Sequence, residues 1–418
     1  MFLIILFLLY DSLPPLPDLS KIAYPEPQLW IEPTDDYLIL QGYTKDFYGA
    51  KIAAHLERLY LSTRYEHKND WDSTILGNIT TSYLIPLSQI WIQPGIDGFF
   101  LQRDDKYRLM TPHLDFSSSI PWVIIWGGLD YDLWQINKRN YIEEKAKLAI
   151  IFDQTPYMPH FEIAEIYTGK QIKPQITGKL HIHNFHVAVG SPILYGFPSP
   201  NLEIQYLEPK IKFETKLKSG LVYKTLSQFL DPETPIKYSI PVPDESLALG
   251  IDFGFTFDLC NHLSGFSSSY KNWNTRLIAG DGLKLVKVYD IQEACVLIKL
   301  KNSVDNKLFN IKNSFQAQYN WTDKRIPFLA QYSLLDTISA NLGFFEISAV
   351  TEYLSKRDGI DKILPAMFII NPILGLRFKF LKLSLMTNNI TNENEEIFDA
   401  YFLAQRQYAG SLEINYKF

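Results

Sequence analysis

The sequence predicts an all-β fold, namely a single large antiparallel transmembrane β-barrel of about 16–20 strands. Runs of roughly ten to fifteen residues alternate apolar and polar side chains, whereas a strand in a soluble protein has about five or six residues. A tilted strand that crosses a bilayer needs about 9–11 residues. The 27 Phe, 25 Tyr and 8 Trp residues suit the aromatic girdles of such barrels. No convincing amphipathic helix is visible, and residues 142–152, the most helix-like stretch, are interpreted as a strand.

The composition excludes several classes of protein. The chain has 418 residues, with 40 basic and 46 acidic side chains, and this balance argues against nucleic acid as a partner. No run reaches the ~18 apolar residues of a membrane-spanning helix. Cys260 and Cys295 are too few for a disulfide framework, and two inert thiols are favoured over one bridge.

Residues 1–35 are interpreted as a leader and residues 36–418 as the barrel. The apolar run Phe2–Tyr10 is followed by a proline-rich stretch, as in the hydrophobic part of a secretory signal peptide. No Lys or Arg precedes this run and no Ala-x-Ala-like cleavage site follows it. The segment therefore indicates export only weakly.

The clearest strand covers residues 247–258. Side chains on a strand alternate between the two faces of the sheet, so every second residue shares a face. The residues predicted to face lipid are Leu247, Leu249, Ile251, Phe253, Phe255 and Phe257. Small and polar residues alternate with them and are expected to face a wet lumen.

The last strand has the same pattern and ends on an aromatic residue. Its apolar or small positions are Tyr408, Gly410, Leu412, Ile414, Tyr416 and Phe418. This ending resembles the signal by which the barrel-assembly machinery receives a new outer-membrane chain. We therefore expect these residues to form a membrane-insertion signal, with that machinery and outer-membrane lipid as partners.

A row of lysines, with one acidic residue among them, occupies one face of the strand near residue 215. The row consists of Lys212, Lys216, Lys218 and Lys224, together with Glu214. A cationic lining would favour the passage of anions, because charged rings bias the selectivity of a pore. The simpler interpretation, which we favour, is a solvated wall. Trp122 and Trp126 share another face and are interpreted as membrane-interface anchors rather than a sugar-stacking platform.

Histidines suggest a metal site only weakly. His181 and His183 lie two residues apart on a strand, a spacing that can chelate a transition metal. We expect His186 to face the opposite side of a regular strand, which removes the obvious third ligand. The sequence therefore predicts no metal site and no cofactor.

Several motifs in the C-terminal half resemble those of TonB-dependent receptor barrels. They are Arg325-Ile326-Pro327-Phe328, Leu364–Asn371, Asn389-Ile390-Thr391-Asn392, Arg406-Gln407-Tyr408 with the ending Gly410–Phe418, and, upstream, Leu207-Glu208-Pro209. Their order and spacing are more specific than any one of them. The resemblance covers the chain from about residue 200 onwards and implies a barrel that binds or passes a solute.

One departure from that family bears on function. Those receptors carry a globular plug inside the barrel and, ahead of it, a short TonB box. Here strand-like sequence begins by about Tyr37, so we expect no plug and carry over no coupling to TonB.

The leading hypothesis is a receptor-like or porin-like barrel of the bacterial outer membrane that passes or binds an unknown solute. A structural or surface-interaction barrel without transport is the first alternative, and a soluble secreted β-sandwich binding protein is the second. No spaced set of nucleophile, base and orienting group occurs, so no enzymatic activity and no catalytic residue are predicted.

Overall fold

The computed structural model describes residues 37–417 apart from parts of the connections between strands. The gaps are residues 46, 57, 69–73, 103–105, 121–122, 153–158, 169–170, 183, 195–196, 199–200, 209, 223–244, 260–261, 281–283, 307–308, 394, 399–400 and 403–405. The expected leader, residues 1–35, lies outside the described residues, as do Phe418 and Cys260. No helix long and apolar enough to cross a membrane occurs among the residues that are described.

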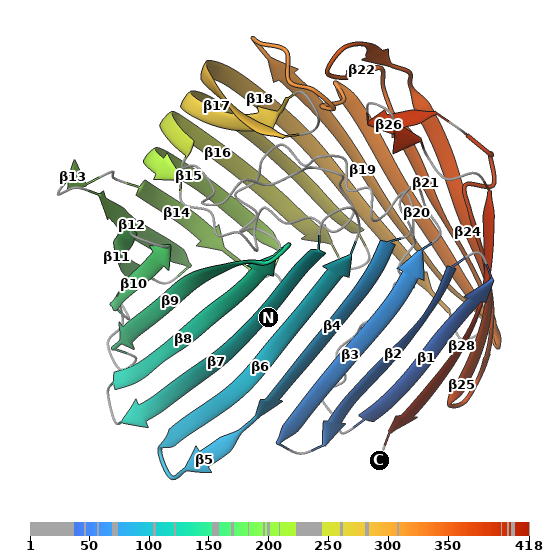
Figure 1. Ribbon diagram of the computed structural model, residues 1–418, viewed down its shortest axis with the longest axis horizontal. Helices are drawn as coiled ribbons and strands as arrows, with labels where there is room; N and C mark the ends of the chain where they lie inside the picture. The colour runs from blue at the N-terminus through green and yellow to red at the C-terminus, as the bar shows by residue number, and fades with distance from the viewer. Residues whose placement is uncertain are drawn as a thin grey trace.

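Strands make up the described chain (Figure 1). The main strands are β1 (Tyr37–Lys45), β2 (Phe47–Leu56), β3 (Leu59–Lys68), β4 (Thr74–Tyr83), β6 (Ile90–Gln102), β7 (Lys106–Ile120), β8 (Val123–Ile136), β9 (Arg139–Ile151), β10 (His160–Thr168), β11 (Gln171–Ile182), β12 (Phe185–Leu194), β14 (Asn201–Leu207), β15 (Ile211–Val222), β16 (Glu245–Leu259), β17 (His262–Ala279), β18 (Leu285–Asp305), β19 (Asn310–Thr322), β20 (Tyr332–Leu342), β21 (Phe345–Leu354), β24 (Met367–Phe378), β25 (Leu381–Asn388) and β28 (Gln407–Lys417). Shorter strands are β5 (Ile85–Leu87), β13 (Phe197–Pro198), β22 (Arg357–Asp358), β23 (Ile363–Leu364), β26 (Glu396–Phe398) and β27 (Tyr401–Phe402).

The main strands form one antiparallel sheet whose pairings run round an unbroken ring. Each main strand pairs with the next one along the chain, and β28 pairs with β1 from Tyr37↔Lys417 to Lys45↔Ala409. Of the 24 strands in this sheet, β5 and β13 each pair with a single neighbour, so the other 22 make up the ring. Closure leaves no sheet edge, which is the condition for a strand-built wall in lipid. The predicted antiparallel barrel is confirmed, and the β-sandwich alternative is wrong because no second large sheet packs on this one in the described chain.

The ring contains more strands than the predicted 16–20. Several turns lack the Gly, Pro or Asn-Gly pairs that mark a hairpin in a sequence. Asn137-Lys138 and Lys379-Phe380 are examples, and Asn137, Lys138 and Lys379 all adopt positive φ angles without being glycine. Neighbouring strands joined by such turns are counted as one run when patterning alone is used.

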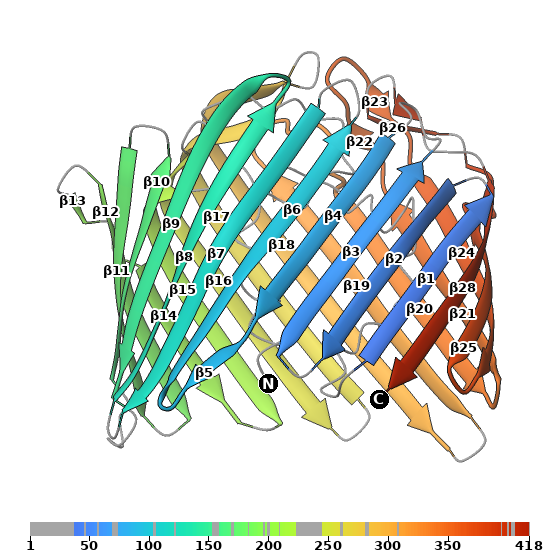
Figure 2. The ribbon, with the colours of Figure 1, turned by 60° about the horizontal axis from the view of Figure 1, so that its bottom comes forward.

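The two ends of the barrel differ in the length of their connections (Figure 2). At the end where β28 finishes, neighbouring strands are joined by turns as short as residues 343–344 and 379–380. At the opposite end, called here the far end, the connections include residues 223–244, 355–366 and 389–406. Short turns on one side and long loops on the other are typical of outer-membrane barrels.

An apolar band covers the outer face of the ring. Successive strands contribute Ile79, Ile96, Met110 and Leu129, whose side chains are all exposed. Over the middle of these strands, the inner face carries polar and charged residues at the intervening positions, such as Thr80, Asp97, Thr111 and Asp132. An apolar outer surface and a polar inner surface are the arrangement expected of a barrel in a membrane.

The strand β16 follows the predicted pattern with one exception. Leu249, Ile251, Phe253 and Phe255 are exposed on the outer face, and Phe257 on the same row is half-buried. Leu247, predicted to face lipid, is instead only 4% exposed. The register against β17 shifts on both sides of Leu247, and such an irregularity turns the side chain to the other face. Leu247 therefore packs on the inner side with Trp273, Ile291 and Ile326.

The final strand β28 agrees with its predicted alternation where its side chains are described. Tyr408 and Leu412 are exposed, whereas Ala409 between them is buried. Tyr416 contributes its backbone, which pairs with Leu38 of β1. Recognition of this strand by assembly machinery remains a prediction.

Residues of two family-like motifs meet at the far end. The backbone N–H of Asn389 donates to Asn371 Oδ1 at 2.6 Å, and Asn389 Nδ2 donates to the carbonyl of Glu393 at 2.6 Å. Asn389 has φ 52°, a left-handed conformation that asparagine tolerates better than most residues. This turn fixes the entry of the connection 389–406.

A second group of far-end residues packs round a buried arginine. Arg357 donates to the carbonyl of Pro365 at 3.1 Å, and burial lowers the pKa of its guanidinium. Phe328 and Leu364 are fully buried. The Ala330↔Arg357 bridge and the hydrogen bond from the Phe328 N–H to the Asp358 carbonyl link the connections after β19 and β21 at this group.

Candidate functional site

Among the described residues, the inner wall of the barrel carries several networks of paired charges, and three of them lie on separate groups of neighbouring strands. The first spans β14, β15 and β16, where cross-strand register places Glu203 opposite Lys216 and Lys216 opposite Asp252. Cross-strand partners project from the same face of a sheet, so these side chains can meet. The alternation of the three strands therefore builds a polar surface on the side opposite the apolar band.

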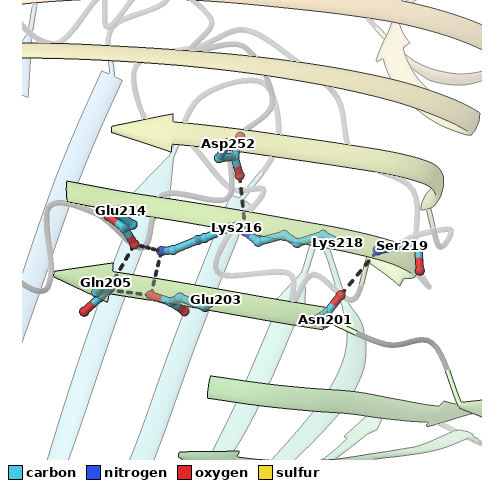
Figure 3. Close-up of polar contacts among 8 residues, drawn as sticks. All are labelled: Asn201, Glu203, Gln205, Glu214, Lys216, Lys218, Ser219 and Asp252. Carbon is cyan, nitrogen blue, oxygen red and sulfur yellow. Dashed lines mark hydrogen bonds and ion pairs between the residues drawn. The ribbon is translucent and has the colours of Figure 1, made fainter. Parts of the chain in front are cut away.

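Lys216 is the centre of this first network (Figure 3). Its ammonium lies 2.5 Å from Glu214 Oε1 and 3.4 Å from Glu203 Oε1. Gln205 Nε2 donates to Glu203 at 2.5 Å and to Glu214 at 3.0 Å, which links the two carboxylates. The Lys216 side chain is only 8% exposed, so the carboxylates replace most of its contact with water.

The neighbouring lysine makes a looser pair. Lys218 Nζ lies 3.7 Å from Asp252 Oδ2, and both side chains are about a quarter exposed. The other row members differ: Lys212 lies on the same strand face, and Lys224 lies outside the described residues. Because acidic partners surround Lys216 and Lys218, the lysine row is not a bare cationic lining.

A second network lies on β7, β8 and β9. The side chain of Asp132 is 2% exposed. Its carboxylate accepts a hydrogen bond from Thr111 Oγ1 at 2.7 Å and forms an ion pair with Lys145 Nζ at 2.6 Å. Nearby, His113 Nδ1 lies 3.5 Å from Asp97 Oδ2. Hence this wall also carries its charges in pairs.

An apolar cluster lies on the far-end side of this second network, on the inner face. Its buried members are Leu76, Leu101, Tyr107, Trp134 and Ile136. They come from the far-end halves of β4, β6, β7 and β8, where the inner positions change from polar to apolar. Leu101 and Trp134 are each 2% exposed, so this part of the wall is screened from solvent.

The third network lies on β21, β24 and β25. Glu346 Oε2 accepts from Lys382 Nζ at 2.9 Å and from Arg377 at 3.3 Å. The Lys382 side chain is 7% exposed, as sheltered as Lys216 on the other wall. The same design, a sheltered lysine held by a carboxylate from a neighbouring strand, thus occurs on separate parts of the ring.

The remaining sequence-based candidates are placed as follows. Trp126, interpreted as an interface anchor, lies instead on the inner face, where Lys147 Nζ sits 4.5 Å from the centre of its ring. Strand parity explains the difference, because Trp126 shares its face with Asp130 and Asp132. Trp122 lies outside the described residues.

The histidines also differ from the expected arrangement. The hairpin between β11 and β12 places His186 directly opposite His181, so the two occupy positions on the same face. The expectation that His186 faces away is wrong, because the residues belong to two paired strands rather than one. His183 lies outside the described residues, and no group of three metal-ligating side chains is found among those described.

Sequence reasoning missed most partners of the charged networks. Glu203 and Gln205 lie two apart, as do Asp130 and Asp132, and this spacing was the available signal. The register that brings Lys145 to Asp132 is set by the Asn137-Lys138 turn, which contains neither glycine nor proline. The register that brings Glu203 to Lys216 is set by the pairing of β14 with β15, which alternation within either strand does not specify. No pattern within one strand could have found these pairs.

Comparison with known proteins gives relatives by structure alone. No protein-family model matches the chain, and no curated protein matches its sequence. Among solved structures, the siderophore receptor PiuA from Acinetobacter baumannii matches 92% of this chain and 82% of its own, with a TM-score of 0.64 and 9% identity. The FrpB iron transporter from Neisseria meningitidis (F3-3 variant) matches 96% of this chain and 83% of its own, with a TM-score of 0.60 and 10% identity.

A further match is a copper transporter, OprC, which covers 91% of this chain and 80% of its own, with a TM-score of 0.59 and 10% identity. Identities this low show a shared fold. The resemblance of the C-terminal motifs to TonB-dependent receptors is thereby confirmed for the barrel architecture.

Proposed function

We propose that this chain is a barrel of the bacterial outer membrane that binds or passes a polar solute along its inner wall. The observation that supports this proposal is a closed ring of strands with an apolar band outside and paired charges inside. Such a wall offers donors and acceptors to a solute while neutralising its own charge. The similar solved structures, named as transporters or receptors rather than enzymes, support the same class of function.

The solute class follows from the charge arrangement. In the networks around Lys216, Asp132 and Glu346, each lysine pairs with one or two carboxylates. A lumen lined in this way has no strong preference for anions, in contrast to a bare lysine row. We therefore propose a neutral or zwitterionic polar solute with several hydrogen-bonding groups.

Conductance in planar lipid bilayers tests the proposal. Purified barrel should give discrete open-channel steps, and a gradient of KCl should produce a reversal potential close to zero. A strongly anion-selective current would contradict the neutralised wall. A folded, heat-modifiable barrel that gives no steps would contradict passage and leave binding, which equilibrium dialysis with labelled oligosaccharides or small peptides would then test.

A structural or surface-interaction barrel is the second candidate, and one observation favours it. Inner-wall side chains such as Leu101, Trp134 and Glu143 are at most 2% exposed, as expected where a lumen is filled rather than open. Absence of both conductance and solute binding would support this second function.

A further inference from the structure

Two tryptophans flank one row of the inner wall, towards the end with the short turns. Trp91 is the second residue of β6, and Trp126 is the fourth residue of β8. Ser117 of β7 lies between them, because it is directly opposite Trp91 on one side and Trp126 on the other. Neighbouring strands are about 4.8 Å apart, so the two indoles leave the same face of the sheet about 10 Å apart.

A carboxylate lies beside both tryptophans. Asp115 is two residues before Ser117 on β7, so it shares the inner face and is a diagonal cross-strand neighbour of Trp91 and of Trp126. Diagonal neighbours on adjacent strands are within reach of aromatic side chains. Gly128 of β8 lies directly opposite Asp115, and a Cβ on this glycine would lie 2.6 Å from Asp115 Oδ1. The Asp115 carboxylate therefore lies over Gly128, on the strand that also carries Trp126.

Asp115 departs from the charge pairing of its neighbours. The carboxylates of Asp132 and Asp97 on this wall lie beside Lys145 and His113, respectively. The Asp115 side chain is exposed, and it has no hydrogen-bond or ion-pair partner among the described residues. Its carboxylate is therefore open to a group that arrives from the lumen.

The contact of Lys147 with Trp126 shows that an indole on this wall accepts a cation. Lys147 of β9 lies directly opposite Gly128, and its Nζ is 4.5 Å from the centre of the Trp126 ring. The face of an indole attracts cations because its π electrons carry a negative potential. The indole of Trp91 is 51% exposed, so a cation from the lumen can reach it in the same way.

The charge of this surface favours a cation over an uncharged sugar. Asp130 lies two residues beyond Gly128 on the same face of β8, and the lysine opposite it, Lys145, forms its ion pair with Asp132. Asp130 and Asp115 therefore add negative charge to the surface between the tryptophans. A cation gains from this local potential, whereas an uncharged ring does not.

We propose that Asp115, Trp91 and Trp126 bind the ammonium group of a solute in the lumen. The carboxylate supplies the opposite charge, and the indoles contact the alkyl carbons around the nitrogen, as in the aromatic cages that recognise quaternary ammonium groups. This inference rests on the proposed function and narrows it. The solute that the wall accepts is a zwitterion or an organic cation that carries an alkylammonium group.

Isothermal titration calorimetry of the purified full chain in detergent micelles tests this site with choline as the probe. The comparison ligand is the uncharged isostere of choline, in which a tert-butyl group replaces the trimethylammonium group. The isostere should bind about tenfold or more weakly, because it has the same shape without the charge. Asp115→Asn should weaken choline binding about tenfold, and Trp91→Leu about fivefold.

Matched variants elsewhere on the ring control for general effects of these substitutions. Asp305 is an exposed carboxylate at the last position of β18, and Trp321 of β19 is 42% exposed on the outer face. Neither Asp305→Asn nor Trp321→Leu should change the affinity for choline. Lys147→Met should strengthen choline binding about fivefold, because it removes the internal cation from the face of Trp126.

The outcomes separate this site from the proposed function. Heat-modifiable migration on gels shows that each variant is folded. Equal affinities for choline and its isostere, or an effect of Asp115→Asn no larger than that of Asp305→Asn, would overturn the ammonium site. Discrete conductance steps without choline binding would overturn this site alone, whereas the absence of both conductance and any solute binding would overturn the proposed function as well.

Discussion

Replacing Lys216 with methionine should destabilise the barrel much more than the same change at Lys218. Methionine keeps most of the length of the lysine side chain and removes its charge. At Lys216 the change leaves Glu203 and Glu214 facing each other without a cation, joined only through Gln205. At Lys218 it leaves Asp252 alone and partly hydrated.

The size of the difference follows from burial. Breaking a buried ion pair by removing one partner costs about 3–5 kcal/mol. Glu203 is 32% exposed and Glu214 15%, so water restores part of this, and we expect a loss of about 2–3 kcal/mol in the free energy of unfolding. The looser pair at Lys218 should contribute about 0.5–1 kcal/mol.

Guanidinium titration of the barrel in phospholipid vesicles, followed by tryptophan fluorescence, measures both changes. Combining Lys216→Met with Glu203→Gln and Glu214→Gln should recover most of the lost stability, because the uncompensated charges are removed. Equal losses at Lys216 and Lys218, or no recovery in the triple variant, would refute the account of a sheltered, neutralised lysine.

Three further substitutions test packing and the far end. Gly127→Ala should lower the free energy of unfolding by about 1–3 kcal/mol, because its new Cβ would lie 2.7 Å from a backbone carbonyl of β9. Gly410→Ala is the control and should be close to neutral, because nothing lies within 4 Å of its new Cβ. The same guanidinium titration compares the two variants. Asn389→Ala should raise hydrogen exchange and proteolysis in the connection 389–406, because it removes the two hydrogen bonds between the Asn389 side chain and the backbone of Glu393, about 2 kcal/mol in all. Unchanged protection would contradict the role given to this turn. Leu247→Ala should cost about 2–4 kcal/mol and Leu249→Ala less than about 1 kcal/mol, because lipid can fill the space only on the outer face; equal effects would show that the two side chains share an environment.

The architecture could be predicted because a single property, alternation, determines it. Lipid outside and polar groups inside select the period of two in residues 249–257, and closure follows from the need to pair every backbone group. Leu247 was placed wrongly because a local shift of register is not encoded in alternation. The turn at Asn137-Lys138 could not be predicted either, because it depends on positive φ angles at residues other than glycine and contains no proline.

The inner networks could be predicted only in part. Lys216 and Glu214 share a strand, so their common face was visible in the sequence. Glu203 and Asp252 come from other strands, and their position opposite Lys216 depends on the register of two hairpins. Charge that looks unbalanced along one strand can thus be balanced across three, and only the register reveals it.

The unequal lengths of the strands give the wall an uneven height. With about 3.4 Å per residue and a tilt of about 40°, the 21 residues of β18 rise roughly 55 Å, whereas the 10 residues of β2 rise roughly 26 Å, about the thickness of the apolar band. Residues 285–291 of β18 pair with β17 but not with β19, so the hairpin of β17 and β18 extends beyond the neighbouring strands on one side of the barrel (Figure 2). A large molecule that approaches along the cell surface would therefore meet the extended hairpin of β17 and β18 on one side and the shorter strands β2 and β3 on the other. We expect access to the far end of the barrel to be easier from the side of β2 and β3.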